Sequence, residues 1–63
     1  MIQIDRKEGA DGKRYVMRDR RRNEHDVGTF VVTVYTDEEL SREVLESIYE
    51  SSYRERITDD IQN

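Results

Sequence analysis

The chain has 63 residues, of which 33% are hydrophobic and 41% are charged, and its formal net charge at pH 7 is −4. A chain this short forms at most one domain with a small core, which leaves little room for an enclosed active site. It has no cysteine, which excludes disulfides and thiolate metal sites, and no apolar run long enough to span a membrane. We therefore expect a small cytoplasmic domain that is supported by oligomerisation or by docking on a partner.

Positive and negative charges are divided unevenly between the two halves of the chain. Residues 1–25 contain eight Lys and Arg residues against five acids, whereas residues 26–63 contain three Arg residues against ten acids. Such a division indicates either an electrostatic partner or neutralisation of one half by the other within the fold. The sequence leaves both interpretations open.

Three segments have the composition and alternation of β-strands. Residues 1–5 and 14–18 alternate in polarity and flank a polar connection that contains the turn pair Asp11-Gly12, so they predict a β-hairpin. Residues 29–35 are all β-branched or aromatic and predict a third strand. The highly charged residues 19–28 are interpreted either as a long hairpin loop or as the splayed ends of two strands.

Residues 36–57 are predicted to form the one long amphipathic helix of the chain. Thr36 and Glu39 have the spacing of a capping box, in which each side chain accepts a hydrogen bond from the backbone N–H of the other residue. Tyr35 and Leu40 stand at the positions of a hydrophobic staple around this start. We therefore expect the helix to begin directly after the third strand.

These elements predict an α+β fold of type βββα, a three-stranded antiparallel meander followed by one C-terminal helix packed on one face. We expect a single small domain over residues 1–63, with the meander in 1–35, the helix in 36–57 and a frayed tail in 58–63. The predicted core consists of Ile2, Ile4, Tyr15, Met17, Phe30, Val32, Val34, Leu40, Val44, Leu45 and Ile48. The other sheet face is expected to expose Val16, Val31 and Tyr35 among Arg14, Arg18 and Thr33.

The outer side of the predicted helix carries a row of carboxylates, formed by Glu39, Glu43, Glu46 and Glu50. At 3.6 residues per turn these side chains make a stripe about 16 Å long, which is similar in charge to a run of backbone phosphates. Capping accounts for Glu39 but not for the other three. The stripe is interpreted either as a surface that occupies the nucleic-acid-binding groove of another protein or as an ordinary solvated helix face.

A second series at a spacing of four residues runs through Leu45, Tyr49, Tyr53 and Ile57. This spacing drifts around the helix, so both tyrosines are expected at the edge of the core or outside it. Because Tyr is enriched at interface hot spots, Tyr49 and Tyr53 are candidates for protein binding, together with Glu43, Glu46 and Glu50. The alternative is that both rings lie over the sheet edge and complete a thin core.

A basic cluster, made up of Arg14, Arg18, Arg20, Arg21 and Arg22, occupies the second strand and the connection after it. Arg is suited to phosphate contacts, so this cluster is an alternative, nucleic-acid-binding site. At the level of the fold, a three-stranded sheet backed by one helix resembles the small DNA-binding domains of some integrases and plant transcription factors, which lay a sheet in the major groove. The net negative charge, the presence of Asp19 and the lack of an aromatic residue within the stretch from Arg18 to Arg22 argue against that function.

No pattern of residues indicates catalysis or a cofactor. The sequence lacks glycine-rich nucleotide loops and nucleophile motifs. Its single histidine, His25, stands between Glu24 and Asp26 without any further His or Cys to complete a transition-metal site. We therefore expect a non-catalytic protein without a cofactor or metal.

The favoured interpretation is a small protein-binding module that docks its acidic helix face on a larger protein or nucleoprotein complex. In general character such a small, acidic, cysteine-free chain resembles phage and mobile-element inhibitors of nucleic-acid-handling complexes, including anti-CRISPR and anti-restriction proteins. That resemblance implies phosphate mimicry by carboxylates and binding that weakens with salt. The alternatives are a DNA- or RNA-binding regulator that uses the basic cluster, and a structural homodimer that pairs open sheet faces or edges.

Overall fold

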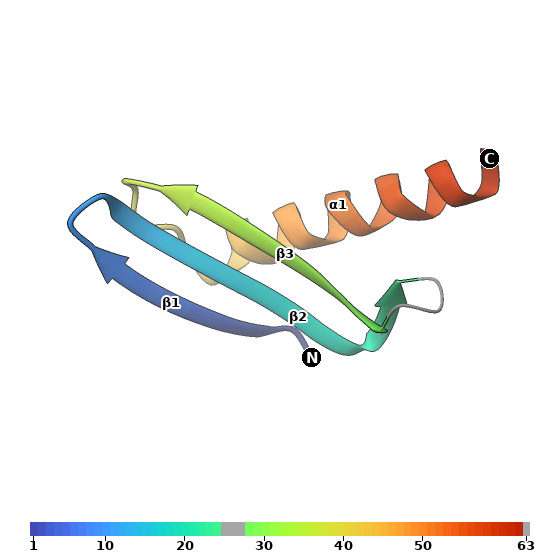
Figure 1. Cartoon of the computed structure of the whole chain (residues 1–63), viewed down its shortest axis with the longest axis horizontal. Coiled ribbons are helices and arrows are strands. Elements are labelled where there is room, and N and C mark those ends of the chain that lie inside the picture. The colour runs from blue at the N-terminus through green and yellow to red at the C-terminus, as the bar shows by residue number, and fades with distance from the viewer. Residues whose placement is uncertain (25–27, 63) are drawn as a thin grey trace.

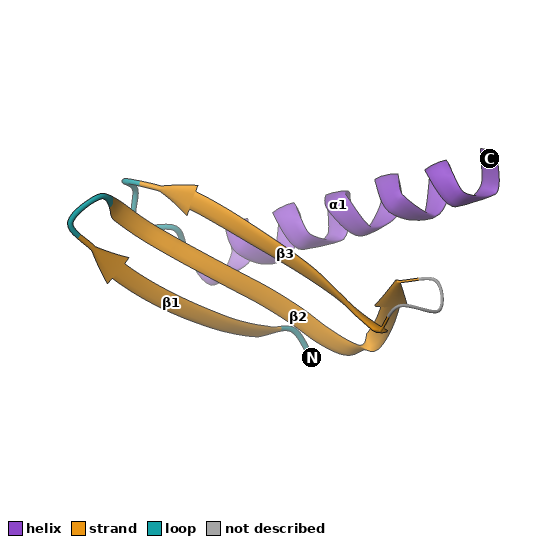
Figure 2. Ribbon diagram, in the orientation of Figure 1, coloured by secondary structure: helices purple, strands orange, loops and turns teal. Residues whose placement is uncertain are grey.

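The chain folds into a three-stranded sheet with one helix on one of its faces. The computed structural model describes residues 1–24 and 28–62. Its elements are β1 (Gln3–Gly9), β2 (Gly12–Glu24), β3 (Gly28–Thr36) and α1 (Arg42–Gln62). The strands pair antiparallel in the order β1-β2-β3, and α1 returns along β3 (Figures 1 and 2). The predicted α+β fold of type βββα is confirmed.

The first two strands are longer than the sequence pattern predicts. Pairing between them continues without a break to Gly9 and Gly12, so only Ala10 and Asp11 connect the strands. The charged residues 6–8, expected in the connection, lie within β1. Each of them is exposed, and a charge can stay in a strand ladder when its side chain reaches solvent.

The connection predicted over residues 19–28 is largely strand. The register between β2 and β3 is regular as far as the pair Arg18 and Val31, and resumes at Asn23 and Thr29. Residues 19–22 therefore lie opposite Phe30 alone, which makes a wide bulge in β2. Bulges bend a strand and redirect its side chains. His25, which was expected to lie in this connection without a metal, is outside the described residues.

The helix begins at Arg42, six residues after the predicted start at Thr36. Ser41 is the N-cap, because its hydroxyl accepts the Val44 N–H at 3.3 Å and its carbonyl accepts the Leu45 N–H at 3.0 Å. Thr36 instead ends β3, and its hydroxyl accepts the Glu38 N–H in a local turn. The predicted capping box is therefore wrong.

A side chain of β2 holds the segment between β3 and α1 away from helical geometry. The Tyr15 hydroxyl accepts the Leu40 N–H at 3.1 Å and lies 3.4 Å from the Glu38 carbonyl, to which it donates. The expected staple is absent as well, because Tyr35 is 75% exposed. At its other end α1 continues through Gln62, beyond the predicted end at residue 57, so the helical backbone covers most of the tail that was predicted to be frayed.

The core lies between the sheet and α1. Its buried hydrophobic side chains are Ile2, Tyr15, Met17, Phe30, Leu45 and Tyr49, and the predicted core residues Ile4, Val32, Val34, Leu40 and Ile48 pack against them with partial exposure. Two predictions are wrong. Val44 is 45% exposed, and Tyr49, expected at the core edge or outside, is fully buried.

A substitution at Gly12 tests how closely the β1–β2 hairpin approaches the end of β3. Its φ is +114°, and a Cβ there would lie 2.6 Å from a carboxylate oxygen of Asp37 and 3.1 Å from the Thr36 carbonyl oxygen. We expect Gly12→Ala to lower the free energy of unfolding by about 1–3 kcal/mol. Gly9→Ala is the matched control, because a Cβ there meets no atom within 4 Å. Urea denaturation measures both variants, and equal stabilities would contradict this role of Gly12.

Candidate functional site

The four carboxylates of the predicted acidic stripe do not form one free surface. Glu39 precedes α1, and its carboxylate pairs with Arg6 of β1 at 2.6 Å. Glu46 pairs with Arg42 and Glu50 with Arg22, each at 2.7 Å. Glu43, the remaining carboxylate of the stripe, is exposed in the first turn of α1, where it meets the positive end of the helix dipole. Cations of the same chain therefore neutralise much of the stripe.

The two candidate tyrosines complete the core. Tyr49 donates its hydroxyl to the Phe30 carbonyl at 3.0 Å, and the two rings meet edge to face with their centroids 5.5 Å apart. Burial and the neighbouring Asp19 carboxylate raise the pKa of the Tyr49 hydroxyl. Tyr53 is half-buried, with Phe30 at 5.4 Å and the Arg22 guanidinium 4.6 Å from its ring centroid. For Tyr49, the structure therefore shows the alternative in which the ring completes the core.

The predicted basic cluster is divided between the two sides of the sheet. Arg22 faces α1, where it pairs with Glu50 and covers the Tyr53 ring. Arg14 and Arg18 lie on the other face, because they alternate with the buried Tyr15 and Met17. Arg20 and Arg21 are exposed in the bulge. The five arginines therefore do not make one continuous patch.

The sheet face that α1 leaves uncovered gathers residues from all three strands, and we call it the open face. The pairing places its members in three rows across the sheet: Gln3–Arg18–Val31, Asp5–Val16–Thr33 and Lys7–Arg14–Tyr35. Among these nine residues, Tyr35 is 75% and Val31 46% exposed. The face holds three cations and one carboxylate, Asp5, which lies 3.9 Å from the Arg18 guanidinium.

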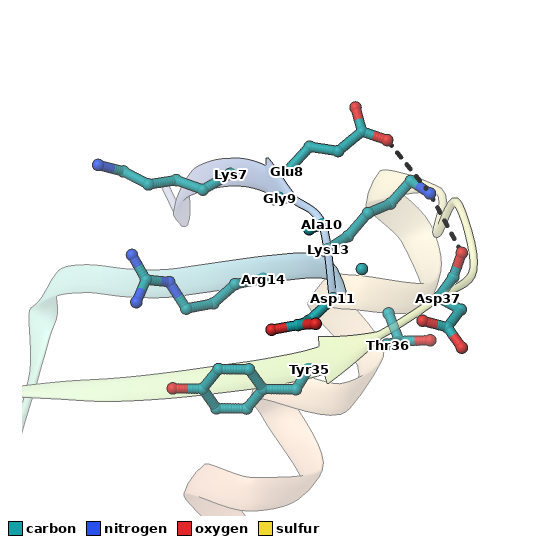
Figure 3. Close-up of a pocket in the computed structure, with 11 residues that line it drawn as sticks. Lys7, Glu8, Gly9, Ala10, Asp11, Lys13, Arg14, Tyr35, Thr36 and Asp37 are labelled. Atoms are coloured by element: carbon teal, nitrogen blue, oxygen red, sulfur yellow. Dashed lines mark hydrogen bonds and ion pairs between the residues drawn. The ribbon is translucent and has the colours of Figure 1, made fainter.

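An aromatic ring lies next to one arginine of the basic cluster. Tyr35 is the cross-strand partner of Arg14, with Lys7 on the far side of that arginine. Figure 3 shows the three side chains extending to the same side of the sheet. Sequence reasoning missed this neighbourhood because it depends on the register between strands, whereas the alternation within each strand placed Arg14 and Tyr35 on the open face correctly.

The two edges of the sheet differ in their protection. β1 carries four consecutive charged residues on one edge, Asp5 to Glu8. β3 forms the other edge and contains neither a charged residue nor proline. In the described part of the chain, no backbone hydrogen bond outside the helix and the strand ladders reaches β3. Charged side chains and proline are the usual means of blocking an edge, so the β3 edge, defined here as residues 31–35, is open to pairing.

Val44 adds an exposed apolar side chain on α1. One side of α1 is turned towards β1 and β2, because Arg42 donates to the Ile2 carbonyl and Glu50 pairs with Arg22. Val44 and Glu50 lie on opposite sides of the buried Leu45–Tyr49 line, each about 120° around the helix from it. Val44 is 45% exposed, and α1 lies along β3 (Figure 1).

An open depression of about 540 Å³ lies where the β1–β2 hairpin meets the end of β3 (Figure 3). Its wall includes Lys13, whose ammonium donates to the Asp37 carbonyl at 3.1 Å and pairs with Glu8 at 3.6 Å. These contacts tie the segment after β3 to the hairpin. Among the described residues, no three His, Cys, Asp or Glu side chains gather to hold a metal ion.

Asp19 is a buried carboxylate at the bulge, and its role is structural. It accepts the Arg21 N–H at 3.0 Å and lies 3.7 Å from the Met1 amine. The backbone hydrogen bond from Arg21 holds the pKa of Asp19 below its ordinary value. The positive charges of the Met1 amine, Arg22 and Arg21 act in the same direction. These partners therefore favour the charged form, which suits an anchor for the bulge.

Comparison of the chain with protein-family models, curated proteins and solved structures finds no match. Within the described residues, no helix is both long and apolar enough to cross a membrane. The function is therefore inferred from the surfaces described above.

The lowered pKa of Asp19 predicts an acid-sensitive component of stability. Because the folded pKa lies below the unfolded one, this component is present above the ordinary value of 3.8 and is lost as the pH falls through the folded pKa. We expect Asp19→Asn to be less stable than wild type at neutral pH and to lose less stability below pH 3.8. Asp11→Asn, in the exposed hairpin connection, is the control, and the measurement is thermal unfolding across the acid range. Parallel profiles for wild type and Asp19→Asn would contradict the assignment.

Proposed function

We propose that the chain is a non-catalytic protein-binding module that engages its partner along the β3 edge and the adjoining part of the open face. The observation that carries this proposal is the contrast between the two edges. β1 is lined with charges, whereas β3 runs for nine residues without one. An unprotected strand edge offers a row of backbone donors and acceptors to a partner strand.

The side chains beside the β3 edge suit a protein partner. Val31 and Tyr35 are exposed on the open face, and Val44 is exposed on the helix side. In strand addition, backbone hydrogen bonds supply affinity and alternate side chains supply specificity. Tyr is also among the residues enriched at protein interfaces, because it offers a large apolar ring with a polar end.

Inhibition through the acidic helix has less support than binding through the sheet. Phosphate mimicry needs carboxylates that are free to meet the cations of another protein. Glu46 and Glu50 already pair with arginines of the same chain, and Tyr49 is buried. If the chain is an anti-CRISPR-like or anti-restriction-like inhibitor, the β3 edge is therefore better suited than α1 to bind its target.

A nucleic-acid-binding function is the second candidate, and one row of the open face favours it. Lys7, Arg14 and Tyr35 stand side by side, and Arg18 lies on the same face. Cations contact phosphates, and an exposed aromatic ring can stack on a base. The overall net charge of −4 opposes this function, since it repels a polyanion at long range.

Partner capture with three variants separates the sheet from the helix. Thr33→Lys places a charge on the β3 edge, and Gln3→Lys places the same charge on the same face beside β1. A third variant replaces Glu43, Glu46 and Glu50 with Gln. Cross-linked capture from host lysate is expected to recover the same proteins with wild type, with Gln3→Lys and with the Gln variant, and to lose them with Thr33→Lys.

Circular dichroism verifies that each of these variants is folded. Capture that survives Thr33→Lys would contradict docking along the β3 edge. Capture that the glutamine replacements abolish, while Thr33→Lys leaves it intact, would assign the function to the acidic helix instead.

Fluorescence anisotropy with single-stranded and duplex DNA and RNA tests the second candidate. Three phosphate contacts on a single strand predict a slope of log affinity against log salt of about −2, and Arg14→Gln is expected to reduce that slope by about 0.7. Arg21→Gln, in the bulge, is the control. Absence of binding at low salt removes this candidate.

A further inference from the structure

We infer that the partner at the β3 edge is a second copy of this chain, paired antiparallel about a two-fold axis through Thr33. This inference rests on the proposed function, because it names the partner of the same edge. The paired strands would join two sheets into one of six strands, with both open faces on the same side and both helices on the other.

The sequence of β3 is complementary to itself about Thr33. An axis there places Val31 opposite Tyr35 of the second copy, twice by symmetry, and Thr33 opposite its own counterpart. Aromatic with β-branched pairs and Thr with Thr pairs are both favourable across antiparallel strands. Val31 and Tyr35 are the two large hydrophobic residues that the open face exposes, and this register covers each with the other.

Charge selects this edge for a copy of the same chain. Antiparallel self-pairing places the residue at the two-fold axis opposite its own copy, so a charge at the axis meets the same charge. β3 has no charged residue, whereas an axis at any residue from Asp5 to Glu8 in β1 would oppose two like charges. Like charges directly opposite each other destabilise a strand pair, so β1 is protected against self-pairing and β3 is not.

The chain exposes more surface than a compact monomer of its mass. The chain exposes 4960 Å², whereas a folded monomer of 7.6 kDa exposes about 4,300 Å². The difference of roughly 650 Å² approaches the ~800 Å² that each partner contributes to a standard protein interface. Domains of this size also commonly depend on association for stability.

The surroundings of β3 set the limits of the pairing. The Phe30 carbonyl already accepts the Tyr49 hydroxyl, so the ladder is expected over residues 31–35. An axis normal to the sheet keeps both helices on the same side of the joined sheet and both open faces on the other side.

Single cysteines test this register directly, because the chain has no cysteine of its own. Opposed residues of antiparallel strands lie within disulfide range, whereas residues four positions out of register do not. Under mild oxidation we expect Thr33→Cys alone to form a covalent dimer. Val31→Cys and Tyr35→Cys should not do so separately, but a mixture of the two should cross-link.

Light scattering and sedimentation provide the second measurement, first on the wild-type chain and then on two variants. The expected result is a reversible dimer whose fraction rises with concentration, and Thr33→Lys should return it to monomer while Gln3→Lys should not. A wild-type monomer at every concentration would overturn the inference, and so would a dimer in which Val31→Cys cross-links with itself. If the wild-type chain is monomeric but captures a different protein, and Thr33→Lys abolishes that capture, the proposed function still holds.

Discussion

The contact between Tyr49 and Phe30 determines which side of α1 faces the sheet, and the surfaces of the molecule follow from that choice. The hydroxyl of Tyr49 satisfies a backbone carbonyl in the core, and its ring packs on the edge of Phe30. With Tyr49 inward, Leu45 one turn earlier is buried and Val44 is turned out. The same rotation brings Glu50 against Arg22. Removal of the aromatic ring would cost about 3–5 kcal/mol, a large fraction of the stability of so small a domain.

Part of the charge division along the sequence is resolved within the fold. Arginines of the N-terminal half pair with glutamates of the C-terminal half, as Arg6 does with Glu39 and Arg22 with Glu50. Together with the pair between Arg42 and Glu46, these contacts leave fewer free carboxylates in the acidic stripe. In the sheet, the contrast between a charged β1 edge and an uncharged β3 edge gives the molecule one surface suited to a protein partner. The open face extends that surface with Val31 and Tyr35.

The fold was predictable from local patterns, whereas the site depended on contacts between distant residues. Alternation in the strands placed Tyr15, Met17 and Phe30 in the core and left Val31 and Tyr35 exposed, as observed. The helix start was missed because the Tyr15 hydroxyl binds the segment before Ser41, a contact no local signal reveals. The inward face of α1 was missed because a spacing of three and four residues through Leu40, Val44 and Ile48 competed with the Leu45–Tyr49 line. The contact of Tyr49 with Phe30 in the sheet turns the Leu45–Tyr49 line inward.

Backbone hydrogen exchange at different protein concentrations tests most directly whether the β3 edge pairs with a second copy of the chain. Amides of a free edge exchange with solvent, whereas amides paired with a second strand are protected. If the strands pair, protection of the outward-facing amides within residues 31–35 rises with concentration, while the amides of β1 exchange at an unchanged rate. Exchange within residues 31–35 that is independent of concentration, or protection that appears only in the first turns of α1, would contradict this pairing.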